Sequence, residues 1–202
     1  MTKPKIVPYA DVAVFHGHSC PGLALGYRVA VAALENLAAK RTRDEELVCV
    51  VENSACGVDA VQAVTGCTFG KGNLIFKDYG KHVFTFFHRP SRKALRFSAK
   101  MARPPEPGNV DMVSISNRVL SGTASEDEKR LWKRSRTARI RLILQSPDES
   151  VFDMRPVEYA ELESAHIFES VVCDRCGERV MATRTVSKNG KALCIPCSQA
   201  VG

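Results

Sequence analysis

Hydrophobic and small residues recur every three or four positions between residues 23 and 39, a spacing that predicts an amphipathic helix. Ala24, Gly26 and Ala30 are small, so another element could approach this helix closely. The next run, residues 47–51, is apolar at every position and predicts a buried strand. A turn of small residues follows it, and residues 58–64 then predict a short helix.

The middle of the chain favours strands and then helices. Residues 74–77 and 82–88 predict two strands joined as a hairpin, and residues 93–99 predict a third. Three prolines between residues 101 and 108 predict a loop. Helices are expected at 111–120 and 126–144, the second opening with a capping box at Ser125 and Glu128. Residues 148–163 show only short mixed segments and predict a connector, while residues 1–14 predict a short extended lead-in. The pattern is that of an α+β domain, an antiparallel sheet with helices at one side.

Composition agrees with a globular protein. The chain has 202 residues, of which 45% are hydrophobic and 25% are charged, enough for one substantial domain and a small appendage. No stretch of apolar residues is long enough to span a membrane, and the first residues lack the apolar core of a signal peptide. We therefore expect a cytoplasmic protein. Its eight cysteines are then expected to be metal ligands or reactive thiols rather than disulfides.

The net charge of +7 is concentrated in one part of the chain. Residues 89–145 hold 14 Lys and Arg against 5 Asp and Glu, so the remainder is slightly acidic. Such a stretch can meet nucleic acid, an anionic cofactor or an acidic partner, or it can be a solvated helix face. Because the helix at 126–144 also carries an apolar side with Leu131, Ala138 and Leu142, we expect a subunit or domain contact rather than a nucleic-acid contact.

Two histidines and a cysteine lie within five positions, at His16, His18 and Cys20, just before the first helix. Imidazole and thiolate are metal ligands, and alternation in an extended segment would place all three on one face. The unpaired N–H groups of the helix start would lower the pKa of a thiol there. The alternative is two loop histidines and a buried free cysteine.

Cys56 lies at the turn between the strand at 47–51 and the next helix, and Cys67 follows in a glycine-rich segment. Because turns at strand tips often meet on one face of an α+β domain, we expect His18, Cys20 and Cys56 to share one metal. His16 is a possible further ligand, and Cys67 is expected close by. Nitrogen and sulfur ligands favour zinc, with iron or nickel possible, and three protein ligands would leave a position open. The alternative is that Cys56 is a core residue.

Four further cysteines form two Cys-x-x-Cys pairs, Cys173 with Cys176 and Cys194 with Cys197, separated by 17 residues. This spacing is typical of a structural zinc ribbon, whose four thiolates close the coordination shell. Asn189 and Gly190 between the pairs predict a hairpin turn. An iron site or a redox dithiol is the alternative. We expect a small ribbon or treble-clef-like domain at residues 166–202, after an α+β domain at residues 1–165.

The stretch from Phe15 to Arg28, FHGHSCPGLALGYR, resembles the signature of the FmdE subunit family of formylmethanofuran dehydrogenase. Residues 52–73 and the cysteine pair that begins at Cys173 support the resemblance, which extends over essentially the whole chain. It implies an α+β domain with a metal-site cleft, a C-terminal zinc finger and a homodimer. The family motif points to five site residues: His16, His18, Cys20, Cys56 and Cys67.

The family takes its name from a molybdenum or tungsten enzyme that reduces carbon dioxide onto methanofuran. Nothing in these 202 residues could house a molybdopterin centre, so the resemblance implies a metal-binding protein accessory to such an enzyme complex. One alternative is a stand-alone metalloenzyme or thiol enzyme that uses Cys20 or Cys56. Another is a nucleic-acid-binding regulator, although the ribbon lacks interleaved aromatic residues for base stacking. The sequence leaves open whether the chain is an enzyme.

Overall fold

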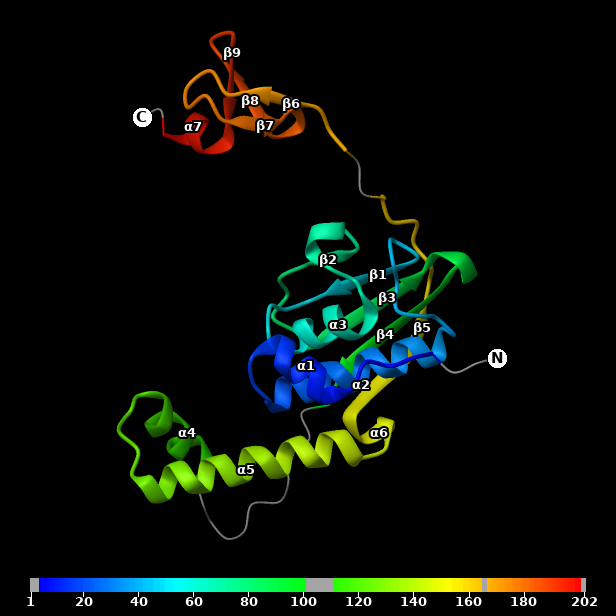
Figure 1. The fold of residues 1–202 in the computed structure, drawn as a ribbon, viewed down its shortest axis with the longest axis vertical. Coiled ribbons are helices and arrows are strands. Elements are labelled where there is room, and N and C mark those ends of the chain that lie inside the picture. Colours follow the sequence, from blue (N-terminus) through cyan, green and yellow to red (C-terminus); the bar gives the residue numbers. More distant parts are fainter. Residues whose placement is uncertain (1–3, 101–110, 165–166, 201–202) are drawn as a thin grey trace. The chain divides into compact units, whose positions relative to one another are not determined.

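The computed structural model describes residues 4–100, 111–164 and 167–200. The loop predicted at residues 101–108 lies outside these ranges. The chain divides into two compact units, Met1–Ser164 and Ala165–Gly202, called here the N-terminal and C-terminal units (Figure 1). Within the described ranges, no helix is long and apolar enough to cross a membrane.

A five-stranded sheet forms the centre of the N-terminal unit, with strand order β2-β1-β3-β4-β5. Its strands are β1 (Leu47–Val51), β2 (Leu74–Phe76), β3 (Val83–His88), β4 (Lys93–Ala99) and β5 (Phe152–Val157). All neighbours are antiparallel except β1 and β2, which pair in parallel with Cys49 opposite Leu74. Helices and a mostly antiparallel sheet confirm the predicted α+β class.

The predicted hairpin between β2 and β3 is wrong, because β1 lies between these two strands. Every residue of β1 is buried, and an apolar strand of this kind requires a partner on both of its edges. The interval predicted as a connector contains β5, which pairs with β4 at the edge of the sheet. Four of its six residues are exposed and it contains Pro156, so its sequence lacks the pattern of a central strand.

Helices α1 (Tyr9–His16), α2 (Pro21–Asn36) and α3 (Gly57–Thr65) lie on one face of the sheet (Figure 1). The helices predicted at 23–39 and 58–64 are confirmed, but the lead-in predicted as extended contains a helix. Val12 of α1 is fully buried in the core between the helices and the sheet. A helix of eight residues is too short for its pattern to separate helix from strand.

The glycine in α2 allows the close approach that its small residues predict. A Cβ atom on Gly26 would lie 2.2 Å from the carbonyl oxygen of Gly57 at the start of α3. A contact below 3 Å is impossible without movement of one backbone, so α2 and α3 pack together only because this position is glycine. This packing places the residue before α3, Cys56, beside the start of α2.

The predicted helices at 111–120 and 126–144 are α4 (Met112–Leu120) and α5 (Glu126–Gln145), and the capping box at Ser125 is present. The buried side of α5 differs from the prediction. Ile140, Ile143 and Leu144 pack on the core, whereas Ala138 is exposed. Arg28 of α2 donates a hydrogen bond of 2.6 Å to the carbonyl oxygen of Ile143 and pairs with Asp148 of α6 (Asp148–Val151), so the end of α5 is held against α2.

The opposite face of the sheet has a smaller core. Val48 and Phe87 pack there against Tyr159 and Leu162, which follow β5. The alternation along β1 explains the division, because Leu47, Cys49 and Val51 face the helices while Val48 and Val50 face this smaller core.

The C-terminal unit contains two short hairpins and one helix. The first pairs β6 (Ser170–Val172) with β7 (Arg179–Met181), the second pairs β8 (Thr185–Lys188) with β9 (Lys191–Cys194), and α7 (Ile195–Gln199) follows. Asn189 and Gly190 both have positive φ, as the predicted Asn-Gly turn requires.

Candidate metal centre

His16 is the last residue of α1, and its ring is fixed from one side. Its Nδ1 lies 2.6 Å from Oδ2 of Asp59 in α3. The other ring nitrogen, Nε2, is buried and has no hydrogen-bond partner, the only such side-chain nitrogen or oxygen among the described residues. A buried nitrogen without a partner costs free energy unless it binds something, and a metal-bound histidine commonly has a carboxylate on its second nitrogen.

The turn after α1 brings the next two ligand-type side chains to the same place. Gly17 ends the helix with φ of 90°, a left-handed conformation that favours glycine. The rings of His16 and His18 lie with their centroids 4.5 Å apart. Cys20 is the N-cap residue of α2, and its Sγ accepts a hydrogen bond of 3.3 Å from the backbone N–H of Leu23. The segment is a helix end followed by a turn, so the predicted extended alternation is wrong, although the side chains still converge.

Cys56 lies immediately before α3 and completes the group. Burial raises the pKa of its thiol, and a hydrogen bond with the Cys20 thiol adds to the effect. The ligand atoms of His16, His18, Cys20 and Cys56 all lie within 4.8 Å of one another. Zinc bonds of about 2.0–2.3 Å separate two ligands of one ion by at most about 4.6 Å, so the group is close to the size that one ion requires. The donor set and the unpartnered nitrogen of His16 both fit a metal ion.

Cys67 is not part of this group. It is fully buried beside β1, where its Sγ donates a hydrogen bond of 3.3 Å to the carbonyl oxygen of Leu47. Burial raises the pKa of this thiol to about 11, which opposes formation of a thiolate. Its surroundings are those of a core cysteine.

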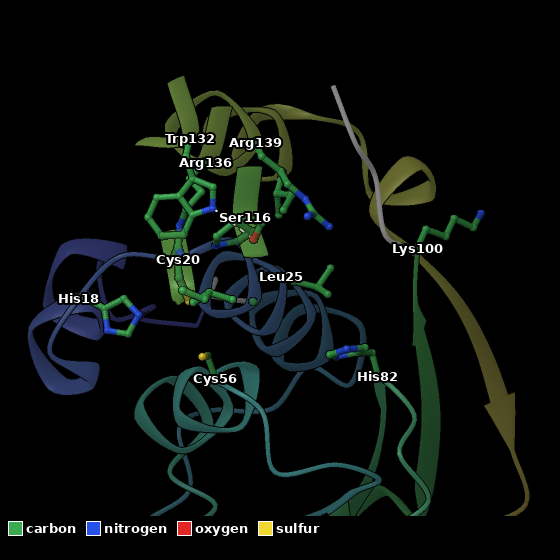
Figure 2. Close-up of a pocket in the computed structure, with 14 residues that line it drawn as sticks. His18, Cys20, Leu25, Cys56, His82, Lys100, Ser116, Trp132, Arg136 and Arg139 are labelled. Carbon is green, nitrogen blue, oxygen red and sulfur yellow. Dashed lines mark hydrogen bonds between the residues drawn. The ribbon is translucent and has the colours of Figure 1, made fainter. Parts of the chain in front are cut away.

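A cavity of about 450 Å³ opens beside the four ligands (Figure 2). His18, Cys20 and Cys56 are part of its wall, together with His82 and Lys100 from the sheet. The rest of the wall comes from the helical segments, with these residues: Pro21, Gly22, Leu25, Ser116, Leu120, Trp132, Arg136, Arg139 and Ile143. A small molecule in this cavity would therefore reach the metal-type ligands directly.

Two groups of residues at this site carry only a weak signal in the sequence. Asp59 lies three residues after Cys56, a spacing that places both on one side of a helix start. Trp132, Arg136, Arg139 and Ile143 are spaced by four, three and four, so they form one stripe along α5. This periodicity is present in the sequence, but the many other basic residues of the helix conceal it.

The second cysteine group is in the C-terminal unit. The sulfur atoms of Cys173, Cys176, Cys194 and Cys197 lie within 4.8 Å of one another. Backbone N–H groups of Cys176, Cys194 and Arg175 lower the pKa of Cys173 to about 6, which favours the thiolate. Four such thiols in a unit with a core of only a few residues fit a structural zinc ion.

Comparisons with known proteins agree with both sites. The model of the family described as "FmdE, Molybdenum formylmethanofuran dehydrogenase operon" matches residues 15–153, and that of the prokaryotic dksA/traR C4-type zinc finger matches residues 166–201. A crystal structure of an FmdE-like protein of tungsten formylmethanofuran dehydrogenase type from Syntrophus aciditrophicus shares the fold, with a TM-score of 0.60 and 23% identity over 100% of this chain and 98% of that one.

A probable S-adenosyl-L-methionine-binding protein of Archaeoglobus fulgidus is 35% identical over 193 residues. The alignment covers 91% of this chain and 50% of the relative, so the chain spans about half the length of the curated protein that it matches. The family model covers more than half of the chain and includes all four ligands of the N-terminal group. The chain therefore belongs to the FmdE family and carries a C4-type zinc finger at its C-terminal end.

Proposed function

We propose that the N-terminal unit is a metal centre that binds a small molecule in the adjoining cavity. His16, Cys20 and Cys56 hold one ion, for which zinc is the best candidate, with iron and nickel as alternatives. The observation that carries this proposal is the buried Nε2 of His16, which has no partner and whose ring is oriented by Asp59.

His18 is the fourth ligand, and we assign it a different role. It is exposed and lies in the cavity wall, whereas Cys20 is buried and the side chain of His16 is only 11% exposed. A molecule in the cavity can therefore replace His18 without disturbing the other three. When bound, the ion supplies a Lewis acid at the position that His18 gives up.

The chain's own residues perform the remaining tasks. Asp59 holds the ring of His16 so that Nε2 faces the ion. The N–H group of Leu23 supports the charge on Cys20, and the close packing of α2 on α3 sets the separation between Cys20 and Cys56. Leu25, Pro21 and Leu120 form apolar parts of the wall that limit the access of water.

The test is the metal content of the full chain purified without added metal. Two ions per chain are expected, one in each cysteine group. Cys20→Ala and Cys56→Ala should each hold one ion and remain folded, while Cys67→Ala, a cysteine outside the group, should hold two. The proposal fails if Cys20→Ala and Cys56→Ala both keep the metal count of the unchanged chain.

The association with one-carbon metabolism comes from the name of the family. We propose that the chain works as an accessory protein beside a formylmethanofuran dehydrogenase-like complex, and that it is a homodimer. Val113 and Leu120 of α4 are more than half exposed and would support such a contact. Sedimentation of the purified chain tests the dimer: a monomer at micromolar concentration would contradict it.

S-adenosyl-L-methionine is a second candidate for the small molecule, suggested by the name of the Archaeoglobus relative. Trp132 in the cavity wall supports it, since an indole ring can stack on adenine. Calorimetric titration of the chain with S-adenosyl-L-methionine tests this candidate, and the absence of heat at millimolar ligand would exclude it.

A further inference from the structure

We propose that the cavity selects small anions: a carboxylate or phosphate group is bound by Arg136 and Arg139, and the apolar part of the molecule lies against Trp132 and Leu25. This inference names the ligand class of the proposed metal centre and rests on it in that respect.

The charges of the wall carry the first step. Lys100, Arg136 and Arg139 line the cavity, and no Asp or Glu is among the described residues that do so. The charge of Lys100 is offset from outside the wall, since its Nζ lies 2.6 Å from Oδ1 of Asp153. Two thiolates and a divalent ion cancel, so the charge that the wall itself presents is positive. A positive, partly enclosed cavity attracts anions.

The position of the arginines carries the second step. Both lie on the stripe of α5 that faces the cavity, and in Figure 2 they lie with Trp132 above the thiols of Cys20 and Cys56. Because Arg28 holds the end of α5 against α2, the stripe and the ligands at the start of α2 belong to one packed assembly. The arginines are therefore fixed opposite the metal ligands.

The orientation of Arg136 carries the third step. Its guanidinium carbon lies 4.3 Å from the centre of the Trp132 ring. Stacking of this kind restricts the side chain before a ligand arrives, so less conformational entropy is lost on binding. A guanidinium group presents paired N–H donors, which match the two oxygen atoms of a carboxylate or phosphate.

The apolar part of the wall completes the ligand class. Leu25, Leu120 and Ile143 line the same cavity as the arginines. A fully hydrated inorganic ion would gain nothing from these side chains, whereas an organic anion would bury its apolar body on them. The sulfonium cation of S-adenosyl-L-methionine is disfavoured by the two arginines, so S-adenosyl-L-homocysteine should bind more tightly than S-adenosyl-L-methionine.

Trp132 provides the readout, because it is the single tryptophan of the chain and lies in the cavity wall. The zinc-loaded full chain is titrated with benzoate, with its neutral analogue benzamide and with inorganic phosphate while Trp132 fluorescence is recorded. A saturable change is expected with benzoate, at an affinity at least about tenfold above that for benzamide, because a charge-assisted hydrogen bond is lost in the amide. Phosphate should compete with benzoate and bind more weakly.

The matched variants are Arg136→Gln with Arg139→Gln, and Arg134→Gln as control. Arg134 is an exposed arginine of α5 that lies outside this cavity. The double variant should bind benzoate and benzamide equally, and the control should keep the full preference. Equal binding of the two compounds to the unchanged chain, a preserved preference in the double variant, or no saturable change with either anion would overturn the inference.

The metal content of each sample separates this result from the proposed function. If the double variant loses the anion preference and keeps two ions per chain, the inference holds and the metal centre is intact. If Cys56→Ala keeps its metal but the anion preference depends on the arginines, the proposed ligand set is wrong and the anion site remains.

Discussion

Oδ2 of Asp59 lies 2.6 Å from Nδ1 of His16, and this contact joins the end of α1 to the first turn of α3 across 43 residues of sequence. It directs Nε2 of His16 toward Cys20 and Cys56, where the nitrogen has no other partner. The contact therefore does for the ligand group what no single segment of the chain could do: it fixes a side chain from α1 with respect to one at the start of α3.

Replacement of Asp59 by Asn should weaken the N-terminal metal site without unfolding the chain. The amide removes the negative charge that orients and polarises the His16 ring, so metal affinity should fall about 10–100-fold. Competition with a chromophoric chelator measures the affinity. Asp11→Asn is the matched control, an exposed carboxylate of α1 that should have no effect. An unchanged affinity in Asp59→Asn would contradict the assignment of Asp59 as a positioning residue.

His16 and His18 should respond differently to replacement by Ala. We expect His16→Ala to lower the metal affinity at least about 100-fold, because it removes a permanent ligand and its carboxylate support. His18→Ala should lower it about tenfold or less, because water can take the vacated position. Chelator competition on the two variants, side by side, measures both. Equal losses would show that His18 is as permanent a ligand as His16.

Gly26→Ala should destabilise the N-terminal unit. The added methyl group would meet the backbone of Gly57, which cannot move without separating α2 from α3, so a loss of about 1–3 kcal/mol in the free energy of unfolding is expected. Gly22→Ala is the matched control on the same helix. Its methyl group would lie 3.5 Å from Cβ of Cys56, an ordinary contact, and helix propensity should make it neutral or stabilising. Urea unfolding measures both variants, and equal stabilities would contradict the close packing.

Cys176→Ser should unfold the C-terminal unit and leave the N-terminal unit folded. The buried core of the C-terminal unit consists of Cys173, Leu193 and Cys194, so most of its stability must come from the bound ion. Limited proteolysis followed by mass spectrometry should show cleavage throughout residues 171–202 and protection before residue 160. Cys67→Ala, which removes a cysteine of the N-terminal core, should leave residues 171–202 protected. Resistance of the Cys176→Ser variant at these positions would rule out a structural ion.

Duplex DNA should bind the chain weakly. The basic residues of α5 are divided between the cavity, which holds Arg136 and Arg139, and the outer side with Arg134, so they do not form one continuous surface. Fluorescence anisotropy with a labelled duplex should show binding that disappears by about 200 mM salt, as expected for a few phosphate contacts. Sequence-selective binding that persists above this concentration would instead favour a regulator.

The elements that the sequence predicts well are those with a strong local signal. The apolar run of β1, the period of α2 and the capping box of α5 each arise within a single segment, where local periodicity and capping decide the outcome. The two Cys-x-x-Cys pairs also carry their own information, because a structural metal site depends mainly on ligand type and spacing. His16, His18, Cys20 and Cys56 stand out as ligand types for the same reason.

Only the tertiary structure decided how these segments meet. The order of strands depends on which edges of β1 are covered, so β3 pairs with β1 and not with β2, and the exposed edge strand β5 has no sequence signal of its own. Cys67 is indistinguishable by sequence from Cys56, yet its thiol is held by Leu47 in the core. The partnership of His16 with Asp59 and the arginines of the cavity wall depend on contacts between segments that are distant in sequence, and such contacts are determined by packing rather than by local pattern.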